Sequence, residues 1–147
     1  MAECASNRKV FYDYEILGEY EAGIALHGYE VKSVRAGRMN LAGSFVVLRS
    51  DEAWLTNADI APYQAKNTPA GYDSTRSRRL LLHKREISEL FGKTAHQGLT
   101  LVPLRVYTKG PKIKLTFGLA RRKKKYDKRE VIRRRDTERE IGRSLKR

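Results

Sequence analysis

Residues 99–120, LTLVPLRVYTKGPKIKLTFGLA, contain two β-rich runs on either side of Gly110 and Pro111. A Gly-Pro pair between two such runs is a turn signal, so this stretch predicts a β-hairpin. Pro103 interrupts the first run and suits an edge position or a bulge, because proline has no backbone N–H to donate to a neighbouring strand. The rest of the chain should supply the strands that pair with this hairpin.

Three segments upstream also have the composition of strands. Residues 14–21 alternate apolar with mostly acidic side chains, and Ile24 and Leu26 prolong the apolar character, which predicts a strand with one wetter face. Residues 44–49 and 53–60 are β-rich runs separated by a short polar segment, which predicts a second hairpin.

Two helices are predicted. From His27 the apolar spacing changes, and Gly37 closes that run as a glycine at a helix C-terminus does. Residues 84–91 place three apolar side chains at positions i, i+3 and i+4, and Gly92 can end this helix. The three side chains of this stripe, which should pack on the sheet, are Ile87, Leu90 and Phe91.

The order of these elements favours one architecture. Short antiparallel strands, with the longer helix inserted before the last hairpin, predict a mainly β fold with helices: an OB-fold-like antiparallel β-barrel of about six strands with two or three helices. Residues 62–79 are too polar and too rich in turn residues for regular structure, so we expect a mobile surface loop there.

Charge divides the chain into two parts. Residues 121–147 contain 14 Lys and Arg against five Asp and Glu, a large share of the net charge of +14. Their apolar residues are too sparse for a core, so we expect a body at 1–120, with its first few residues flexible, and a basic tail at 121–147 that is disordered when free. Clustered cations release counterions from a polyphosphate, so nucleic acid is the expected partner.

Other function classes lack support in the sequence. No stretch is long and apolar enough to span a membrane and none directs export, so we expect no membrane partner and a cytoplasmic location. The three histidines lie far apart and Cys4 is the sole cysteine, so we expect no metal site, cofactor or internal disulfide. Glu21 and Glu30 could form an acid–base pair, but carboxylates among so many cations are more often ion-paired or orienting. We therefore expect a monomer that is not an enzyme.

Candidate RNA contacts are spread along the body. Lys32 and Arg35 are three residues apart, hence on one helix face, where they can straddle phosphates. Other cations that could join them in one basic face are Arg8, Lys9, Arg38, Arg76, Arg78 and Arg79. Side chains that could stack on unpaired bases are Tyr12, Tyr14, Tyr29 and His83. The alternatives stay open: single cations often serve solubility, and tyrosines often pack inside a barrel.

Several strings occur in an order that resembles one family. They are EVKSVRAG at 30–37, IAPY at 60–63, RSRRLLLHK at 76–84, GLTLVPL at 98–104 and GLARRKKKYDKRE at 118–130. In this order they resemble the SsrA-binding protein family, also called small protein B or SmpB, over nearly the whole chain. Two positions depart from the family pattern: Arg122 stands where the family has Gly, and Ser74 where Pro is common. A glycine at the first position would permit positive φ or close approach of RNA.

The resemblance implies a non-catalytic RNA-binding protein. Its OB-fold body would bind the tRNA-like domain of tmRNA (SsrA RNA) and deliver it to stalled ribosomes for trans-translation. Protein and tmRNA together would mimic a tRNA, with the protein replacing the anticodon arm. Glu21, Leu81 and His83 match family residues implicated in binding tmRNA. The expected tmRNA-binding set is completed by Arg8, Lys9, Tyr14, Lys32, Arg35 and Arg78.

For the tail, the resemblance implies a place in the ribosomal decoding site and the vacant mRNA channel, where it would become helical. The residues expected there are Lys123, Lys124, Tyr126, Asp127, Lys128 and Arg129. The alternative function is a constitutive ribosomal protein with a basic tail threaded into rRNA.

Overall fold

The computed structural model describes residues 2–64, 66, 68–96 and 98–124, and the tail beyond Lys124 lies outside the described residues. The helices of this part are α1 (Lys9–Asp13), α2 (Gly28–Arg35) and α3 (Lys84–His96). Its strands are β1 (Ala2–Ser6), β2 (Tyr14–Ile24), β3 (Met39–Asn40), β4 (Phe45–Arg49), β5 (Glu52–Thr56), β6 (Asp59–Ile60), β7 (Arg78–Leu81), β8 (Thr100–Lys109) and β9 (Lys112–Arg122).

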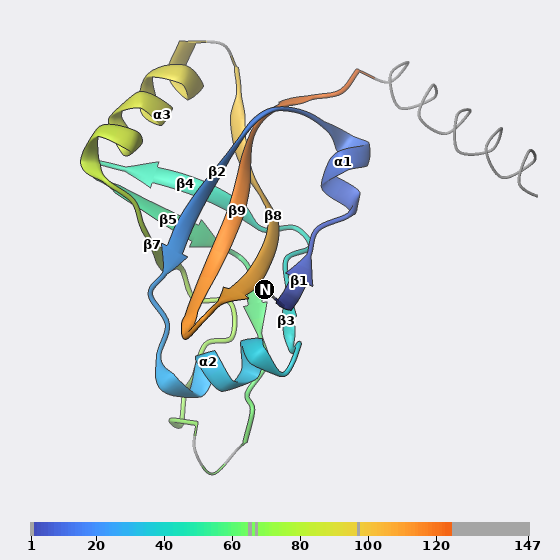
Figure 1. Cartoon of the computed structure of the whole chain (residues 1–147), viewed down its shortest axis with the longest axis vertical. Coiled ribbons are helices and arrows are strands. Elements are labelled where there is room, and N and C mark those ends of the chain that lie inside the picture. Colours follow the sequence, from blue (N-terminus) through green and yellow to red (C-terminus); the bar gives the residue numbers. More distant parts are fainter. Residues whose placement is uncertain (1, 65, 67, 97, 125–147) are drawn as a thin grey trace, which may run out of the picture.

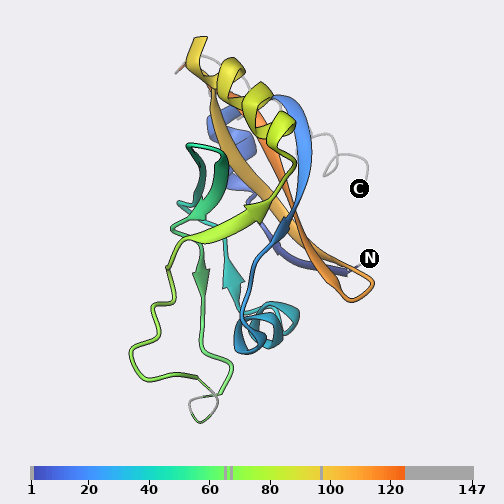
Figure 2. The same cartoon turned by 90° about the vertical axis from the view of Figure 1, so that its left-hand side faces the viewer.

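The main sheet closes into a barrel. Its antiparallel strands follow the order β1-β8-β4-β5-β7-β2-β9, and β9 pairs in turn with β8, so six strands form a ring to which β1 is added. Figure 1 shows β2, β9 and β8 side by side, with α3 at one end of the barrel and α2 at the other. Figure 2, turned by 90°, shows the loop that follows β6 projecting beyond α2. The predicted barrel of about six strands is confirmed.

The hairpin of residues 99–120 forms as predicted. Lys109 pairs with Lys112 across the turn, where Gly110 takes a φ of +60°, a value that glycine adopts without strain. The register with β9 shifts between Pro103 and Arg105, which places the proline at the predicted bulge.

The barrel interior holds the main apolar core. Leu55 of β5, Leu80 of β7, and Leu115 and Phe117 of β9 are at most 2% exposed, and each buried side chain of this size contributes about 1.5–3 kcal/mol. A smaller cluster forms where Val10 of α1 packs on β8 and β9. Both clusters depend on β8 and β9, which explains why this hairpin dominates the fold.

Two details of α3 differ from the prediction. The helix runs through Gly92 to His96, and Phe91 is 54% exposed although Ile87 and Leu90 are buried. A glycine within a helix costs only about 1 kcal/mol. Here the following turn is held by an ion pair between Lys93 and Glu89 and by a hydrogen bond from Thr94 to the Leu90 carbonyl.

The predicted strand at 53–60 is two strands. Asn57 takes a φ of +66°, which interrupts the extended chain, and its side-chain amide donates to the Gly43 carbonyl at 3.2 Å. The residues after this break form β6, which pairs with β3 in a separate two-stranded sheet. The second predicted hairpin therefore consists of β4 and β5 only.

The first 13 residues contain a strand and a helix that the sequence pattern did not predict. Strand β1 pairs with β8 from Ala2 opposite Thr108 to Ser6 opposite Arg105. Its own sequence shows no clear alternation, so the strand depends on the pairing groups that β8 offers. None of the helices in the described ranges is long and apolar enough to cross a membrane.

Candidate nucleic-acid interface

The outward side of β2, β7 and β9 brings together Glu21 and Leu81, two of the residues that the sequence singled out. Gly23 of β2 pairs with Leu81 on one side and with Lys114 on the other, so these three positions form a row across the sheet. Glu21, two residues earlier on β2, points to the same side and is exposed. We call Glu21, Gly23, Leu81 and Lys114 the Leu81 face.

Glu21 is held in one orientation. Its carboxylate accepts a hydrogen bond from the Tyr107 hydroxyl and lies 3.6 Å from the Lys109 ammonium. The Tyr107 hydrogen bond and, to a smaller extent, the neighbouring lysines keep the pKa of Glu21 below its usual value. A fixed, ionised carboxylate can only accept hydrogen bonds. It can therefore accept them from the amino groups of bases or from ribose hydroxyls, whereas it repels phosphate.

Leu81 forms an exposed apolar surface beside this carboxylate. Its side chain is 55% exposed and lies flat over Gly23, where an added Cβ would be 3.2 Å from Leu81 Cδ1. An adjoining hollow is lined by apolar residues and by Lys112 and Lys114. A large exposed apolar side chain flanked by cations fits a base face with its phosphates nearby.

His83 and Arg35 lie at the margins of this region. His83 is exposed at the start of α3, where its backbone N–H donates to Glu86 Oε1 at 3.3 Å. Arg35 is exposed on α2 and donates to the Pro111 carbonyl at 3.0 Å, and Pro111 also lines the hollow beside Leu81.

Arg78 does not belong to a basic surface. Its side chain is fully buried, and its guanidinium donates to Glu30, to the Ala58 and Ser74 carbonyls and to Tyr72. Arg76 pairs with the same carboxylate. We call Glu30, Tyr72, Arg76 and Arg78 the Glu30 network. With its donors engaged inside the protein, Arg78 is not available to a phosphate, which corrects the expected basic face.

The Glu30 network fixes the charge state of its carboxylate. Burial raises the pKa of Glu30, but hydrogen bonds from Arg76, from the His27 backbone and from Arg78 outweigh burial and lower this pKa to about 2. Glu21 and Glu30 thus each have cationic partners of their own, as expected for ion-paired and orienting groups. Sequence reasoning missed this network because its members come from α2, the loop and β7, and no local pattern links them.

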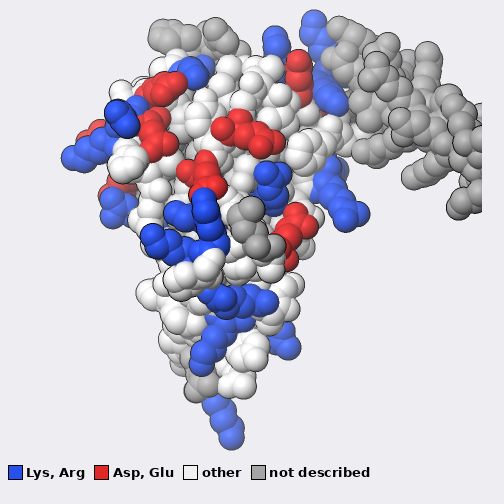
Figure 3. Space-filling view, in the orientation of Figure 1, with Lys and Arg blue, Asp and Glu red and all other residues white. Residues whose placement is uncertain are grey.

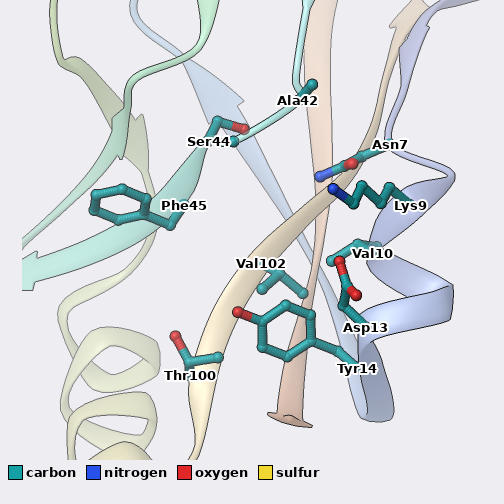
Figure 4. A pocket seen from close by; sticks show the side chains of 11 residues that line it. Asn7, Lys9, Val10, Asp13, Tyr14, Ala42, Ser44, Phe45, Thr100 and Val102 are labelled. Carbon is teal, nitrogen blue, oxygen red and sulfur yellow. The ribbon is translucent and has the colours of Figure 1, made fainter. Parts of the chain in front are cut away.

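Three further predicted residues lie elsewhere on the surface, around α1. Lys9 and Tyr14 line a hollow between α1, β8 and the segment leading into β4, and Arg8 directly precedes this helix. Figure 4 shows the Tyr14 ring lying toward Val102, and Tyr14 packs against the small apolar cluster. The packing alternative for this tyrosine is therefore supported. Lys32 lies on α2 and lines another hollow, together with Tyr29 and Tyr63.

The start of the tail is attached to the body. The Lys123 backbone N–H donates to the Asp13 carbonyl at 2.9 Å, and its ammonium donates to the Phe11 carbonyl at 3.1 Å. Lys124 is exposed. The other expected tail residues, Tyr126, Asp127, Lys128 and Arg129, lie outside the described residues.

Two of the family-like strings supply the residues described above. The string EVKS contributes Glu30, and RSRRLLLHK contributes Arg76, Arg78, Leu81 and His83. The family model described as "SmpB protein" matches residues 4–147. The chain belongs to the SmpB family. The match includes the whole barrel and the tail.

Named relatives agree with this assignment. The SsrA-binding protein of Carboxydothermus hydrogenoformans is 54% identical over 142 residues, which are 97% of this chain and 95% of that protein. The SsrA-binding protein of Chloroflexus aggregans is 53% identical over 147 residues, covering 100% of this chain and 93% of that one. A solved structure described as "tmRNA-SmpB: a journey to the center of the bacterial ribosome" aligns with a TM-score of 0.68 and 48% identity, covering 88% of this chain and 94% of that chain.

Arg122, one of the two positions expected to depart from the family pattern, lies in regular structure. It is the last residue of β9 and pairs with Tyr14 of β2. The strand therefore continues past residue 120 with the extended backbone that any residue can adopt, and no left-handed glycine conformation is needed there.

Proposed function

We propose that this protein binds the tRNA-like domain of tmRNA through the Leu81 face and delivers it to stalled ribosomes for trans-translation, without catalysing a reaction itself. Protein and tmRNA together would imitate a tRNA, the protein replacing the anticodon arm. The tail would enter the decoding site and the vacant mRNA channel. The observation that carries the proposal is the family match over nearly the whole chain, combined with an exposed leucine beside a hydrogen-bonded carboxylate, Leu81 and Glu21, at positions that the resemblance to the family implies for tmRNA binding.

The physical properties of the Leu81 face support selective rather than purely electrostatic binding. Cations alone attract any nucleic acid. A hydrogen-bond acceptor such as Glu21 instead recognises base edges in unpaired or looped RNA. An exposed apolar side chain such as Leu81 packs on base faces. A constitutive ribosomal protein, the alternative raised by composition, is not favoured, because the relatives compared are named SsrA-binding proteins.

The test combines an RNA-binding assay with a tagging assay. We expect the double variant L81A/H83A to bind a transcript of the tRNA-like domain at least about tenfold more weakly, since stacking on one base contributes roughly 1–3 kcal/mol. Tagging of a stalled nascent chain in a reconstituted translation system should fall in parallel. Affinity can be measured by fluorescence anisotropy at fixed salt.

The matched control is L17A, which also removes an exposed leucine from β2 but at a position away from the Leu81 face; Leu17 is 43% exposed. L17A should bind the transcript with unchanged affinity. If L81A/H83A bound and tagged like the unaltered protein, the proposed function of this face would be wrong.

A further inference from the structure

A second surface at the α2 end of the barrel combines aromatic rings with cations. A hollow of about 260 Å³ is lined by Gly28, Tyr29, Lys32, Tyr63 and Gln64. We call it the α2 cleft. It shares no lining residue with the hollow beside Leu81. Its size and its two tyrosines suit a planar ring such as a nucleobase.

Tyr63 is held in place by Arg38. The guanidinium lies 5.6 Å from the centroid of the Tyr63 ring and donates to the Pro62 and Tyr63 carbonyls at 3.4 Å. This cation–π contact fixes a ring that is 38% exposed and places positive charge beside it. A ring that is fixed before binding loses little conformational entropy when a ligand arrives.

Tyr29 is held by two neighbouring aromatic rings. Its ring stacks on His27 at 5.3 Å and meets the Tyr72 ring edge-on at 5.4 Å. The Tyr72 hydroxyl donates to the Ile60 carbonyl at 2.9 Å and accepts from Arg78 at 3.1 Å. The Glu30 network therefore supports one wall of the α2 cleft, which gives these buried charges a role in positioning.

Exposed cations outnumber exposed carboxylates, of which Asp73 is one, on α2 and the described loop segments that adjoin the cleft. The exposed cations of α2 and the adjoining loop segments are Lys32, Arg35, Arg38 and Lys66. Glu30, the carboxylate of α2, is buried and paired. In the view of Figure 3, Lys and Arg side chains lie along the tapered lower end, and the Asp and Glu side chains that are visible lie higher on the body. This end of the protein should therefore attract a polyanion more strongly than a neutral partner.

We infer that the α2 cleft is a second RNA-binding site, which takes an unpaired nucleotide, with its base against Tyr63 and Tyr29 and its phosphate at Lys32. Stacking on fixed aromatic rings next to cations is how proteins bind single-stranded RNA without requiring one sequence. The site goes beyond the proposed function, which rests on the Leu81 face. The nucleotide can come from tmRNA or from rRNA, and the chemistry of the cleft is the same for both.

The experiment uses the full chain and two RNA targets: a transcript of the tRNA-like domain and vacant 70S ribosomes. We expect Y63A to weaken binding to at least one target by roughly 5- to 100-fold, and Y63F to retain most of the affinity, since stacking needs the ring and not the hydroxyl. K32A should lower the slope of log affinity against log salt by about one, as expected for one lost phosphate contact.

The matched controls are F91A, which removes an exposed ring from α3, and R49A, which removes an exposed cation from β4. Both should leave the affinity for the transcript and for ribosomes within about twofold of the unaltered protein. A loss with the transcript assigns the nucleotide to tmRNA, and a loss with ribosomes alone assigns it to rRNA. Unchanged affinity of Y63A for both targets, or an equal loss in Y63F, would overturn the inference. L81A/H83A, measured alongside, tests the proposed function separately.

Discussion

Glu21 is an acidic residue on a face that is proposed to bind RNA. Its role in binding depends on its ability to accept hydrogen bonds. We expect E21Q to weaken binding of the tRNA-like domain by roughly tenfold, because the amide replaces one acceptor oxygen by a donor while the hydrogen bond from Tyr107 can remain. Anisotropy titrations at several salt concentrations measure the effect. The salt slope should be unchanged, because no phosphate contact is lost.

The control for E21Q is E15Q. Glu15 lies on the same strand and is 3.6 Å from Arg121, the same separation that Glu21 has from Lys109. E15Q alters an equivalent exposed ion pair away from the Leu81 face, so it should bind RNA normally. Equal losses in both variants would show that the effect comes from net charge rather than from a specific acceptor.

Glu30 stabilises the fold through a buried ion pair. We expect E30Q to lower the free energy of unfolding at pH 7 by about 3–5 kcal/mol, because two guanidinium groups would lose their counter-charge inside the protein. Urea denaturation measures the loss. The control is E52Q, whose carboxylate is 3.9 Å from Arg79 at the surface and should contribute less than about 1 kcal/mol.

The pKa of Glu30 adds a pH dependence to this prediction. Since the folded state lowers this pKa from 4.5 to about 2, the stabilisation is complete above the unfolded value and is lost as pH falls from about 5 toward 2. The difference in unfolding free energy between the unaltered protein and E30Q should therefore shrink over that range. A difference that stayed constant between pH 7 and pH 3 would contradict this account.

At the residue scale, the sequence could identify residues that resemble a family motif. It could not tell which of them are exposed and which are buried. Arg78 and Arg35 both looked like candidate phosphate ligands, yet the first is fully buried and the second is exposed. The difference arises from Glu30, which lies 48 positions before Arg78 in the sequence. Such long-range pairs leave no periodicity in the chain.

At the scale of elements, the contact between β2 and β7 sets the shape of the Leu81 face. We expect G23A to weaken binding of the tRNA-like domain by roughly 3- to 10-fold, because its Cβ would lie 3.2–3.3 Å from the Leu81 side chain and push it off the strand. The same titrations apply. Heteronuclear NMR of the Leu81 methyl groups would report the displacement directly.

The matched control for G23A is G18A on the same strand. An added Cβ at Gly18 meets no atom closer than 3.8 Å, which is ordinary contact. G18A should keep both the RNA affinity and the Leu81 methyl shifts. If G23A bound RNA as tightly as G18A, the position of Leu81 over β2 would not matter for binding.

The elements that the sequence predicted well are those whose periodicity and turn residues agree, such as the β8–β9 hairpin with Gly110 and the helix α2 closed by Gly37. The misses have physical causes. Strand β1 forms because β8 offers it pairing groups, and α3 passes Gly92 because side-chain contacts of the next turn offset the cost of the glycine. In both cases tertiary or inter-turn contacts outweigh local propensity.

At the scale of the whole molecule, charge is not concentrated in the tail alone. Residues 125–147 contain ten Lys and Arg against five Asp and Glu, so removing them leaves most of the net charge of +14 on the rest of the chain. Exposed cations lie both at the α2 end of the body and where β9 ends, at Arg121 and Arg122. The body can thus hold RNA electrostatically without the tail, which leaves the tail available for a different task.

Truncation after Lys124 tests this division. The cut should fall there because Lys123 bonds to Asp13 and Phe11 and so belongs to the body. We expect the truncated protein to lose less than about tenfold in affinity for the tRNA-like domain, since it keeps the Leu81 face and gives up a net charge of only +5. Tagging of stalled nascent chains should nevertheless be abolished, because the segment proposed to occupy the decoding site is missing.

A full-length variant in which residues 125–147 are shuffled serves as the control, because it retains the length and charge of the tail. If the order of the tail residues matters, this variant should bind the tRNA-like domain as tightly as the unaltered protein and still fail to tag. Restored tagging would mean that positive charge alone suffices, since the shuffled tail has lost the spacing of Tyr126 relative to its flanking cations. Normal tagging by the truncated protein would instead place the ribosomal function in the body.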